Sequence, residues 1–291
     1  MGAAKSAFFN FAIIGLYIWF YLHVKFLGDV LMEDDIRIVS INEENIDKEG
    51  FFCLKSRKKA DGYLQKKEWL LERFKEGLKL HILYQGKRSF AFIEYLPGEY
   101  AWRAVNAAGT MFIHCIWTVG KGQKSGFAKR LLAICEHDAR EAGMNGVTVL
   151  TSSSPWLVDA PFFISQGYQA VDQAPPSFKL LAKKFNDAPD PTLPKNWDER
   201  LQSYSDGLTI VHAAQCPYVP DAIMHIQNAA DELGINSRTV ALDSATQIRE
   251  QAPSAYGIFN VVYNSRLLSY TYLLKKDLIK LLGDELDLIG Q

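Results

Sequence analysis

A glycine-rich stretch, Gly120–Ala128, carries the residues of this chain that are best suited to bind an anion. It follows an apolar run over residues 110–119, which is rich in aromatic and β-branched residues and predicts a strand. It precedes residues 127–142, where apolar residues recur on one stripe and predict an amphipathic helix. A strand, a glycine-rich turn and a helix in this order leave backbone N–H groups unpaired at the start of the helix. With Lys121 and Lys124 in the turn, we expect this stretch to bind a phosphate group.

The spacing within this stretch narrows the choice of phosphate ligand. The sequence has neither the Gly-x-x-x-x-Gly-Lys-Ser/Thr pattern of nucleoside triphosphatases nor the Gly-x-Gly-x-x-Gly pattern of dinucleotide-binding folds. The pattern present, Gln123-x-x-Gly126-x-Ala128, resembles the pyrophosphate loop of the GNAT family of acyl-CoA N-acyltransferases. The alternative is an ordinary strand–turn–helix with a hinge glycine.

The surrounding elements favour the resemblance. A short apolar strand is predicted over residues 147–152, followed by a helix over residues 157–166. The segment Phe162–Tyr168 resembles the closing motif of the family, and residues 78–96 read as the hairpin expected before the central strand. The resemblance covers residues 35 to 185 and implies an α/β (α+β) GNAT fold with a mixed central sheet.

The resemblance implies acetyl-CoA as co-substrate and assigns residues to it. The backbone of the central strand is expected to bind pantetheine and polarise the thioester carbonyl, and the turn is expected to hold the pyrophosphate. The cofactor-binding residues are then Trp117, Thr118, Val119, Gln123, Lys124, Ser125, Gly126, Phe127 and Ala128.

Catalytic roles are implied for three side chains. Glu94, on the hairpin strand next to the central one, is the first candidate for general base, and His114 on the central strand is the second. For His114, the competing interpretation is a satisfied core residue. The helix that carries a proton-donating Tyr in many family members has Phe162 and Phe163 here, so Tyr168 or water would protonate the leaving thiolate.

Acceptor binding is expected between residues 51 and 107. Glu99 is suited to attract an amine, and Tyr100 or Trp102 is suited to stack on it, the alternative for both aromatic residues being simple packing. The predicted amphipathic helix over residues 62–77 is placed to cover the acceptor cleft. Its basic residues, Lys66 among them, are interpreted as a solvated face.

Composition limits the other function classes. The chain has 291 residues, enough for two domains, and a formal net charge of -1, which gives no global basic field for nucleic acid. Its four cysteines are scattered without a Cys-x-x-Cys pair. This pattern argues against a disulfide framework and a zinc site, so no metal is expected and the compartment is predicted to be reducing.

The first 31 residues differ in character from the rest. Residues 7–22 form an almost unbroken apolar run, and with residues up to 27 they approach the length of about 20 residues that spans a bilayer. Residues 1–31 are therefore interpreted either as a membrane anchor or as an appended leader before Met32, and the remaining alternative is a buried core helix. The predicted location is cytoplasmic, with a membrane anchor facing the cytoplasm if residues 1–31 are native.

A second domain is predicted after the GNAT domain at residues 32–185. A Pro-rich linker covers residues 186–206. Residues 207–291 then predict helices and strands in the order β-α-β-α-β-β-α. This order resembles the thioredoxin and glutaredoxin folds. Cys216 at a helix start resembles their active-site turn with the second cysteine lost, and Pro253 occupies the place of their cis-proline.

The combination resembles bacterial proteins labelled YoaP-like. A helix N-terminus lowers the pKa of a thiol, so Cys216 is expected to be a reactive thiol, unless the second domain is an inert scaffold. The leading function is an N-acetyltransferase acting on an amine of a small molecule or peptide. The alternatives are a non-catalytic acyl-CoA or thiol-binding module and a monothiol transfer protein centred on Cys216.

Overall fold

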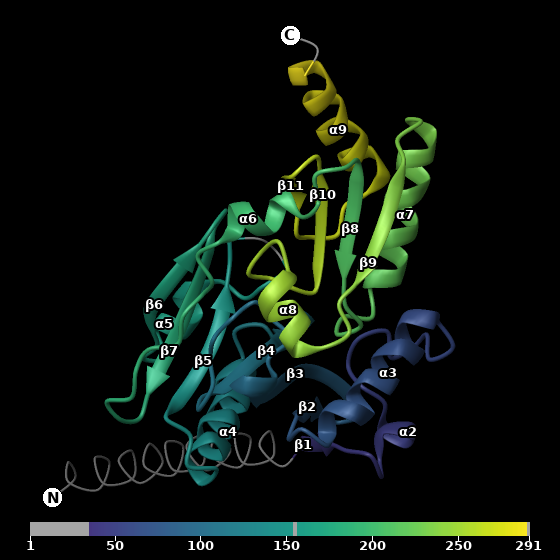
Figure 1. Ribbon diagram of the computed structural model, residues 1–291. Coiled ribbons are helices and arrows are strands. Elements are labelled where there is room, and N and C mark those ends of the chain that lie inside the picture. Colours follow the sequence, from purple (N-terminus) through teal and green to yellow (C-terminus); the bar gives the residue numbers. More distant parts are fainter. Residues whose placement is uncertain (1–34, 154–155, 290–291) are drawn as a thin grey trace, which may run out of the picture.

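The computed structural model describes residues 35–153 and 156–289 (Figure 1). The leader expected over residues 1–31 lies outside this part of the chain. Among the helices that are described, none has both the length and the apolar composition needed to cross a membrane.

The first half of the chain forms a seven-stranded sheet, here called the large sheet, in the order β1-β2-β3-β4-β5-β7-β6. Neighbouring strands are antiparallel except β4 and β5, which are parallel, so the predicted mixed sheet is confirmed. The strands are β1 (Ile36–Ile41), β2 (Lys79–Gln85), β3 (Arg88–Pro97), β4 (Met111–Thr118), β5 (Gly146–Thr151), β6 (Gln169–Ala174) and β7 (Phe178–Lys184).

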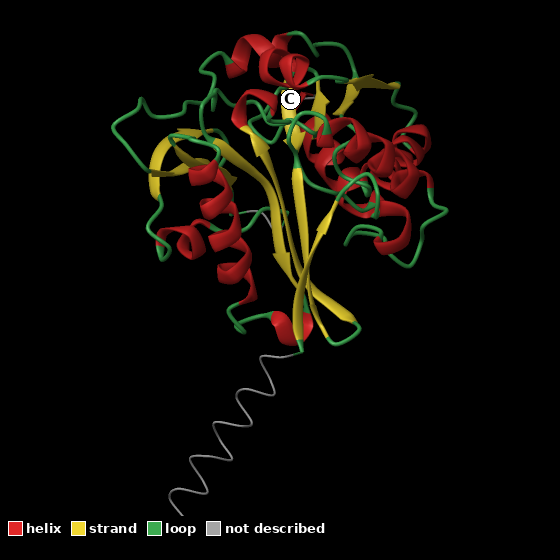
Figure 2. Ribbon diagram, turned by 90° about the horizontal axis from the view of Figure 1, so that it is seen from below, coloured by secondary structure: helices red, strands yellow, loops and turns green. Residues whose placement is uncertain are grey.

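Helices cover both faces of the large sheet (Figure 2). One face packs against α4 (Phe127–Glu141) and α5 (Ala160–Ile164), because α4 turns its buried residues Leu131, Cys135 and Ala139 toward the strands at i, i+4 and i+8 spacing. The other face packs against α3 (Asp61–Phe74). The short α2 (Ile46–Glu49) and the 3₁₀ turns η1 (Gly98–Tyr100) and η2 (Gly120–Gly122) complete this half.

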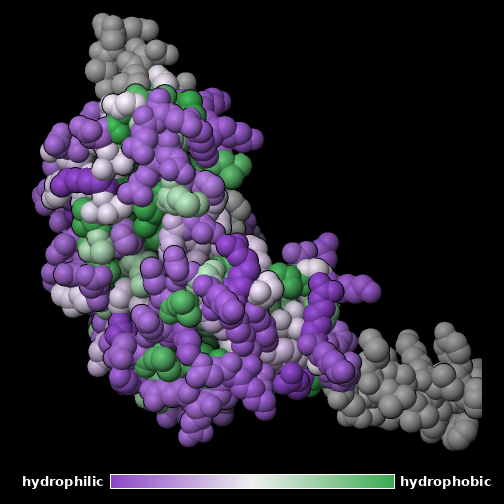
Figure 3. Space-filling model, turned by 90° about the vertical axis from the view of Figure 1, so that its right-hand side faces the viewer, coloured by the Kyte–Doolittle hydropathy of each residue, from purple (hydrophilic) through white to green (hydrophobic). Residues whose placement is uncertain are grey.

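The second half forms a four-stranded sheet, here called the small sheet, in the order β11-β10-β8-β9. Its strands β8 and β9 are parallel, and β10 and β11 are antiparallel to their neighbours. The elements are α6 (Trp197–Gln202), β8 (Leu208–His212), α7 (Val219–Glu232), β9 (Ser237–Ala241), α8 (Ala245–Gln251), β10 (Phe259–Tyr263), β11 (Arg266–Ser269) and α9 (Lys275–Ile289). The outer surface over α7 and α3 is mainly hydrophilic, with small separate hydrophobic patches (Figure 3).

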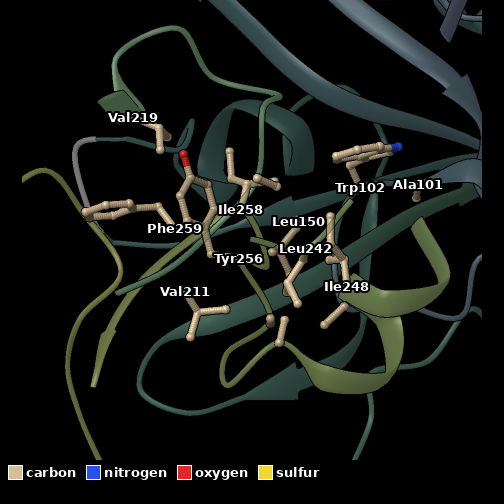
Figure 4. Packing of buried hydrophobic residues seen from close by; sticks show 14 of the residues in the cluster. Ala101, Trp102, Leu150, Val211, Val219, Leu242, Ile248, Tyr256, Ile258 and Phe259 are labelled. Carbon is tan, nitrogen blue, oxygen red and sulfur yellow. The ribbon is translucent and has the colours of Figure 1, made fainter. Parts of the chain in front are cut away.

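The two sheets share one hydrophobic core. Leu150 of the large sheet lies beside Leu242 and Ile248 of the small-sheet half (Figure 4). The contact also involves backbone: a Cβ built on Gly62 of α3 would lie 2.0 Å from the carbonyl oxygen of Pro217. The small-sheet half therefore packs directly on the α3 face of the large sheet.

One backbone expectation is wrong. Within the described residues, the cis X-Pro bond is Pro175–Pro176, in the hairpin between β6 and β7. The bond before Pro253 is trans, so the cis-proline expected beside Cys216 is not formed there.

Candidate active site

The central strands β4 and β5 separate along their length and open a groove. Their pairing runs from Met111–Val147 to Ile113–Val149 and then stops. Beyond that point an open groove of about 480 Å³ lies between the end of β4, the start of α4 and the segment after β5. Four of the residues predicted to bind the cofactor line it, namely Trp117, Thr118, Gln123 and Ala128.

The turn before α4 presents free backbone donors at one end of this groove. Gly126 has φ +76, and a Cβ built on it would find nothing within 4 Å, so the space beside it is open. The first turn-closing bond of the helix is donated by Arg130 N–H to Gly126 O at 3.0 Å. Within the described chain, the N–H groups of Gly126, Phe127 and Ala128 donate to no backbone acceptor. Unpaired donors at a helix start, beside the open space at Gly126, are suited to bind an anion.

The end of β4 also leaves a donor free for the groove. Val119 N–H donates to Phe90 O of β3 at 2.9 Å, and alternate N–H groups of a strand point to opposite edges. The N–H of Thr118 therefore points to the edge where β5 has already diverged. Val119, by contrast, has its N–H committed to β3.

Glu94 lies in a buried polar network on the face of the large sheet that α3 covers. It is 2% exposed, and Lys66 Nζ of α3 donates to its Oε2 at 2.6 Å. Gln215 Nε2, from the turn before α7, donates to its Oε1 at 2.7 Å. Both carboxylate oxygens of Glu94 are thus held by partners from two different parts of the chain.

His114 completes the buried network. β3 and β4 lose register between Glu94–Cys115 and Tyr95–Ile113, so His114 is the extra residue of a bulge in β4. Its Nε2 accepts the N–H of Trp102 at 2.9 Å, which places the proton of the neutral ring on Nδ1. Nδ1 lies 3.3 Å from Glu94 Oε1, close but not aligned as a full hydrogen bond.

The electrostatics of the network fix both protonation states. Burial alone would raise the pKa of Glu94, but the Lys66 charge and His114 outweigh it and hold this pKa at about 2. Burial lowers the pKa of His114 to about 4, although Glu94 opposes the shift. Near neutral pH Glu94 is therefore ionised and His114 is neutral.

The structure does not bring the other predicted catalytic and acceptor residues to the groove. Tyr168 is buried among the residues under α4 and α5, and burial raises its pKa well above the ordinary value. Trp102 is 3% exposed and packs edge-on against Trp69, which matches the packing interpretation. Glu99 lines a separate hollow with Arg249, and Tyr100 is 42% exposed.

Cys216 lies where the two halves meet, beside a small aromatic hollow of about 20 Å³. Trp156, Tyr218, Tyr256 and Tyr272 contribute rings to its wall. Burial raises the pKa of Cys216, although an N–H of Tyr218 opposes the shift. The expectation of a lowered pKa is therefore wrong, because the cost of burying the thiolate exceeds the benefit of the helix start.

Sequence analysis missed two residues of the network, Lys66 and Gln215. The interpretation of Lys66 as solvated is wrong: it is 4% exposed. Lys66 lies three residues after Tyr63 and four residues before Leu70, both of which are buried. This helical spacing places Lys66 on the buried stripe of α3, and it is the sequence pattern that indicates its burial. No pattern indicates that Gln215 pairs with Glu94, because 121 positions separate them. Among the described residues, no group of three or more His, Cys, Asp or Glu side chains is arranged to hold a metal ion.

Several solved structures are similar to this chain. No protein-family model matches the chain. Among solved structures, it is similar to the PaiA N-acetyltransferase of Thermoplasma acidophilum in complex with coenzyme A, at 15% identity and a TM-score of 0.38, covering 52% of this chain and 99% of that one. A GNAT-family acetyltransferase of Brucella melitensis in complex with acetyl-CoA has 13% identity and a TM-score of 0.36, covering 55% and 96%. At these scores the likenesses carry no argument about function.

A curated relative gives the stronger comparison. The chain is 31% identical over 248 residues to the Uncharacterized N-acetyltransferase YoaP of Bacillus subtilis (strain 168), a match that covers 84% of this chain and 98% of that protein. A match of this identity over nearly the whole relative shows common family membership. The chain belongs to the GNAT family of N-acetyltransferases.

Proposed function

We propose that this N-acetyltransferase transfers an acetyl group from acetyl-CoA to an amine of a small molecule or peptide. The observation that carries the proposal is the groove between the diverging ends of β4 and β5, which has the free N–H groups of the α4 turn at one end. The groove is large enough for a pantetheine chain, and the turn offers an anion site for a pyrophosphate.

The residues of the groove divide into binding and polarising roles. Gly126, Phe127 and Ala128 would hold the pyrophosphate through backbone N–H groups, and Gln123, Lys124 and Ser125 would form the rest of that loop. The N–H of Thr118 is placed to polarise the thioester carbonyl, since its edge of β4 has no strand partner. Trp117 and Val119 would shape the channel on either side.

The chemistry is a direct transfer. The amine nitrogen forms a bond to the carbonyl carbon, the C–S bond breaks, CoA leaves as a thiolate, and the amine proton passes to solvent. We assign Glu94 and His114 a positioning role, because both are buried and already bonded within the network. The network joins α3 to strands β3 and β4 and so holds the three elements together beside the groove.

We further infer that residues 207–291 are a thioredoxin-like domain, joined to the GNAT domain at residues 32–185 by the linker at residues 186–206. The strand order β11-β10-β8-β9 and the alternation of helices and strands support this inference. The raised pKa of Cys216 argues against a thiol-transfer function for the domain. The domain then contributes to the enzyme in two ways. Gln215 donates a hydrogen bond to Glu94, and the domain covers the α3 face of the large sheet.

Two measurements on the full chain test the proposed function. Calorimetry should show acetyl-CoA and CoA binding at one site, and a thiol-detecting assay should show CoA release that depends on an added amine. Acetyl-CoA binding without amine-dependent CoA release from a broad panel would favour the non-catalytic module. Absence of acetyl-CoA binding would refute the assignment of the groove.

A further inference from the structure

A second open hollow lies next to the groove. It measures about 700 Å³ and is lined by the end of β5, the start of α5 and the hairpin between β6 and β7. We call it the side hollow. Ser152, Ser153 and Asp159 line both the side hollow and the groove. The two spaces therefore adjoin at these three residues.

The side hollow carries two opposite charges at different distances from the groove. Asp159 lies at the junction and lines both spaces, whereas Lys179 lines the side hollow alone. The other residues that line the side hollow are uncharged. Asp159 uses Oδ1 to accept the N–H of Ala160 at 2.9 Å, which leaves Oδ2 for a ligand. The ammonium of Lys179 has no ion pair or hydrogen bond with any described residue.

The small-sheet half of the chain contacts two residues that line the side hollow. The hydroxyl of Tyr270 lies 2.7 Å from Ser152 Oγ and 3.1 Å from Ser177 Oγ, and both serines line the hollow. The ring of Tyr270 packs on Phe178 with 4.5 Å between the centroids. These contacts hold the end of β5 and the β6–β7 hairpin at a fixed separation, so the hollow is a formed site.

We propose that the side hollow binds the acceptor, and that the acceptor is an amine that also carries an anionic group such as a carboxylate. The proposal rests on the proposed function, because it uses the groove as the place of the thioester. Asp159 accepts a hydrogen bond from the amine at the junction, next to the reacting carbonyl. Lys179 pairs with the anionic group on the far wall. One positive and one negative side chain that line the same hollow select for such an acceptor and against amines without an anion.

The reaction in this site is balanced. The amine binds with its nitrogen toward the groove, the C–N bond forms, and the C–S bond breaks with CoA leaving as the thiolate. The proton lost by the nitrogen passes by way of Asp159 Oδ2 to solvent, because the side hollow is open. The anionic group of the acceptor stays paired with Lys179 and takes no part in the bond changes.

The test compares amino acids with their carboxamides as acceptors for the full chain at saturating acetyl-CoA. The measured quantity is the ratio of kcat/KM for the acid to kcat/KM for the amide. Comparing this ratio between variants cancels the difference in amine basicity between acid and amide. Lys179→Glu should lower the ratio by about tenfold or more, since a favourable charge pair becomes a repulsive one. Lys87→Glu, in the β2–β3 turn and outside the lining of the side hollow, is the matched control and should leave the ratio unchanged.

A second variant tests the junction. Asp159→Asn keeps a side-chain oxygen to cap α5 and removes the charge, so it should lower kcat/KM for acid and amide alike, by about tenfold, with acetyl-CoA affinity within about twofold of wild type. If turnover is too slow to measure, calorimetry with CoA-loaded protein replaces it, and Lys179→Glu must weaken binding of the acid. An unchanged ratio in Lys179→Glu, or no binding of any amino acid, overturns the proposal. Failure of the proposed function differs, because wild-type protein would then either not bind acetyl-CoA or bind it and release no CoA with any amine, with or without an anionic group.

Discussion

The groove and the buried network share one strand, β4, yet they leave different groups available. In the groove the free groups are backbone N–H donors around Gly126 and Thr118, next to open space. In the network the charged side chains of Lys66 and Glu94 are buried and bonded to each other. The side chains that look most reactive in the sequence are thus the ones the fold has already satisfied. We infer that ligand binding depends on the backbone of the turn, and stability depends on the network.

The largest effect expected from this comparison is on the turn. Gly126→Glu should weaken CoA binding by at least about 100-fold, because it places a carboxylate beside the pyrophosphate site and a side chain at φ +76. Calorimetry measures the affinity. Gly143→Glu is the control: Gly143, just beyond the other end of α4, also has a positive φ, +66, and open space around it. Equal losses in both variants would mean that the turn has no special role.

Substitutions in the network should change the free energy of unfolding but not the affinity for CoA. Lys66→Met leaves the Glu94 carboxylate buried without its cation and should lower the free energy of unfolding by about 3–5 kcal/mol. Adding Glu94→Gln should restore at least half of that loss, because the buried charge is then gone. Lys75→Met, which breaks an exposed pair with Glu72, should change stability by less than about 1 kcal/mol. Urea unfolding measures all three, and additive losses in the double variant would contradict a coupled pair.

The pH dependence of stability distinguishes the network from the groove. The unfolded chain protonates His114 near 6.5, but the folded chain resists this until about 4, so the unfolded state binds more protons in that window. Stability should therefore fall as pH drops from 6.5 to 4, by about 3 kcal/mol in total from this residue. Glu94, with its pKa lowered from 4.5 to about 2, adds a further loss below pH 4.5. His114→Asn should flatten the upper window only, which denaturant titrations at several pH values would show.

The sequence predicts the regular elements well, and it fails where contacts join distant segments. The predicted strand at residues 110–119 and helix at residues 127–142 match β4 and α4 closely, because their periodic patterns are local. The burial of Lys66 depends on Glu94, 28 positions away, so charge content alone indicates a solvent-facing residue. The position of the side hollow depends on how the β6–β7 hairpin meets the small-sheet half, which no local pattern encodes.

A smaller effect is expected at the contact between the two halves. Gly62→Ala places a methyl group 2.0 Å from the backbone oxygen of Pro217, so α3 and the turn before α7 must shift apart. We expect a loss of about 1–3 kcal/mol in the free energy of unfolding. Gly283→Ala is the matched control, also a helical glycine, with nothing within 4 Å, and it should be neutral or stabilising by up to about 1 kcal/mol. Stabilisation by both changes would show that the contact is not tight.

The smallest effect is expected for Cys216, and it separates the thiol from the transferase. Burial raises the pKa of this thiol. Burial also raises the pKa of Cys53, Cys115 and Cys135, and the increase is larger for these three thiols. Because the thiolate is the nucleophile, all four should react with iodoacetamide more slowly in the folded protein than in the unfolded one, with Cys216 the fastest of the four. Cys216→Ser should change CoA affinity by less than about twofold, because the turn before α4 lies outside the aromatic hollow. Mass spectrometry of the labelled protein measures the first result and calorimetry the second. Labelling of Cys216 at the rate of the unfolded chain would show an activated thiol and would return the second half of the molecule to consideration as a thiol-transfer domain.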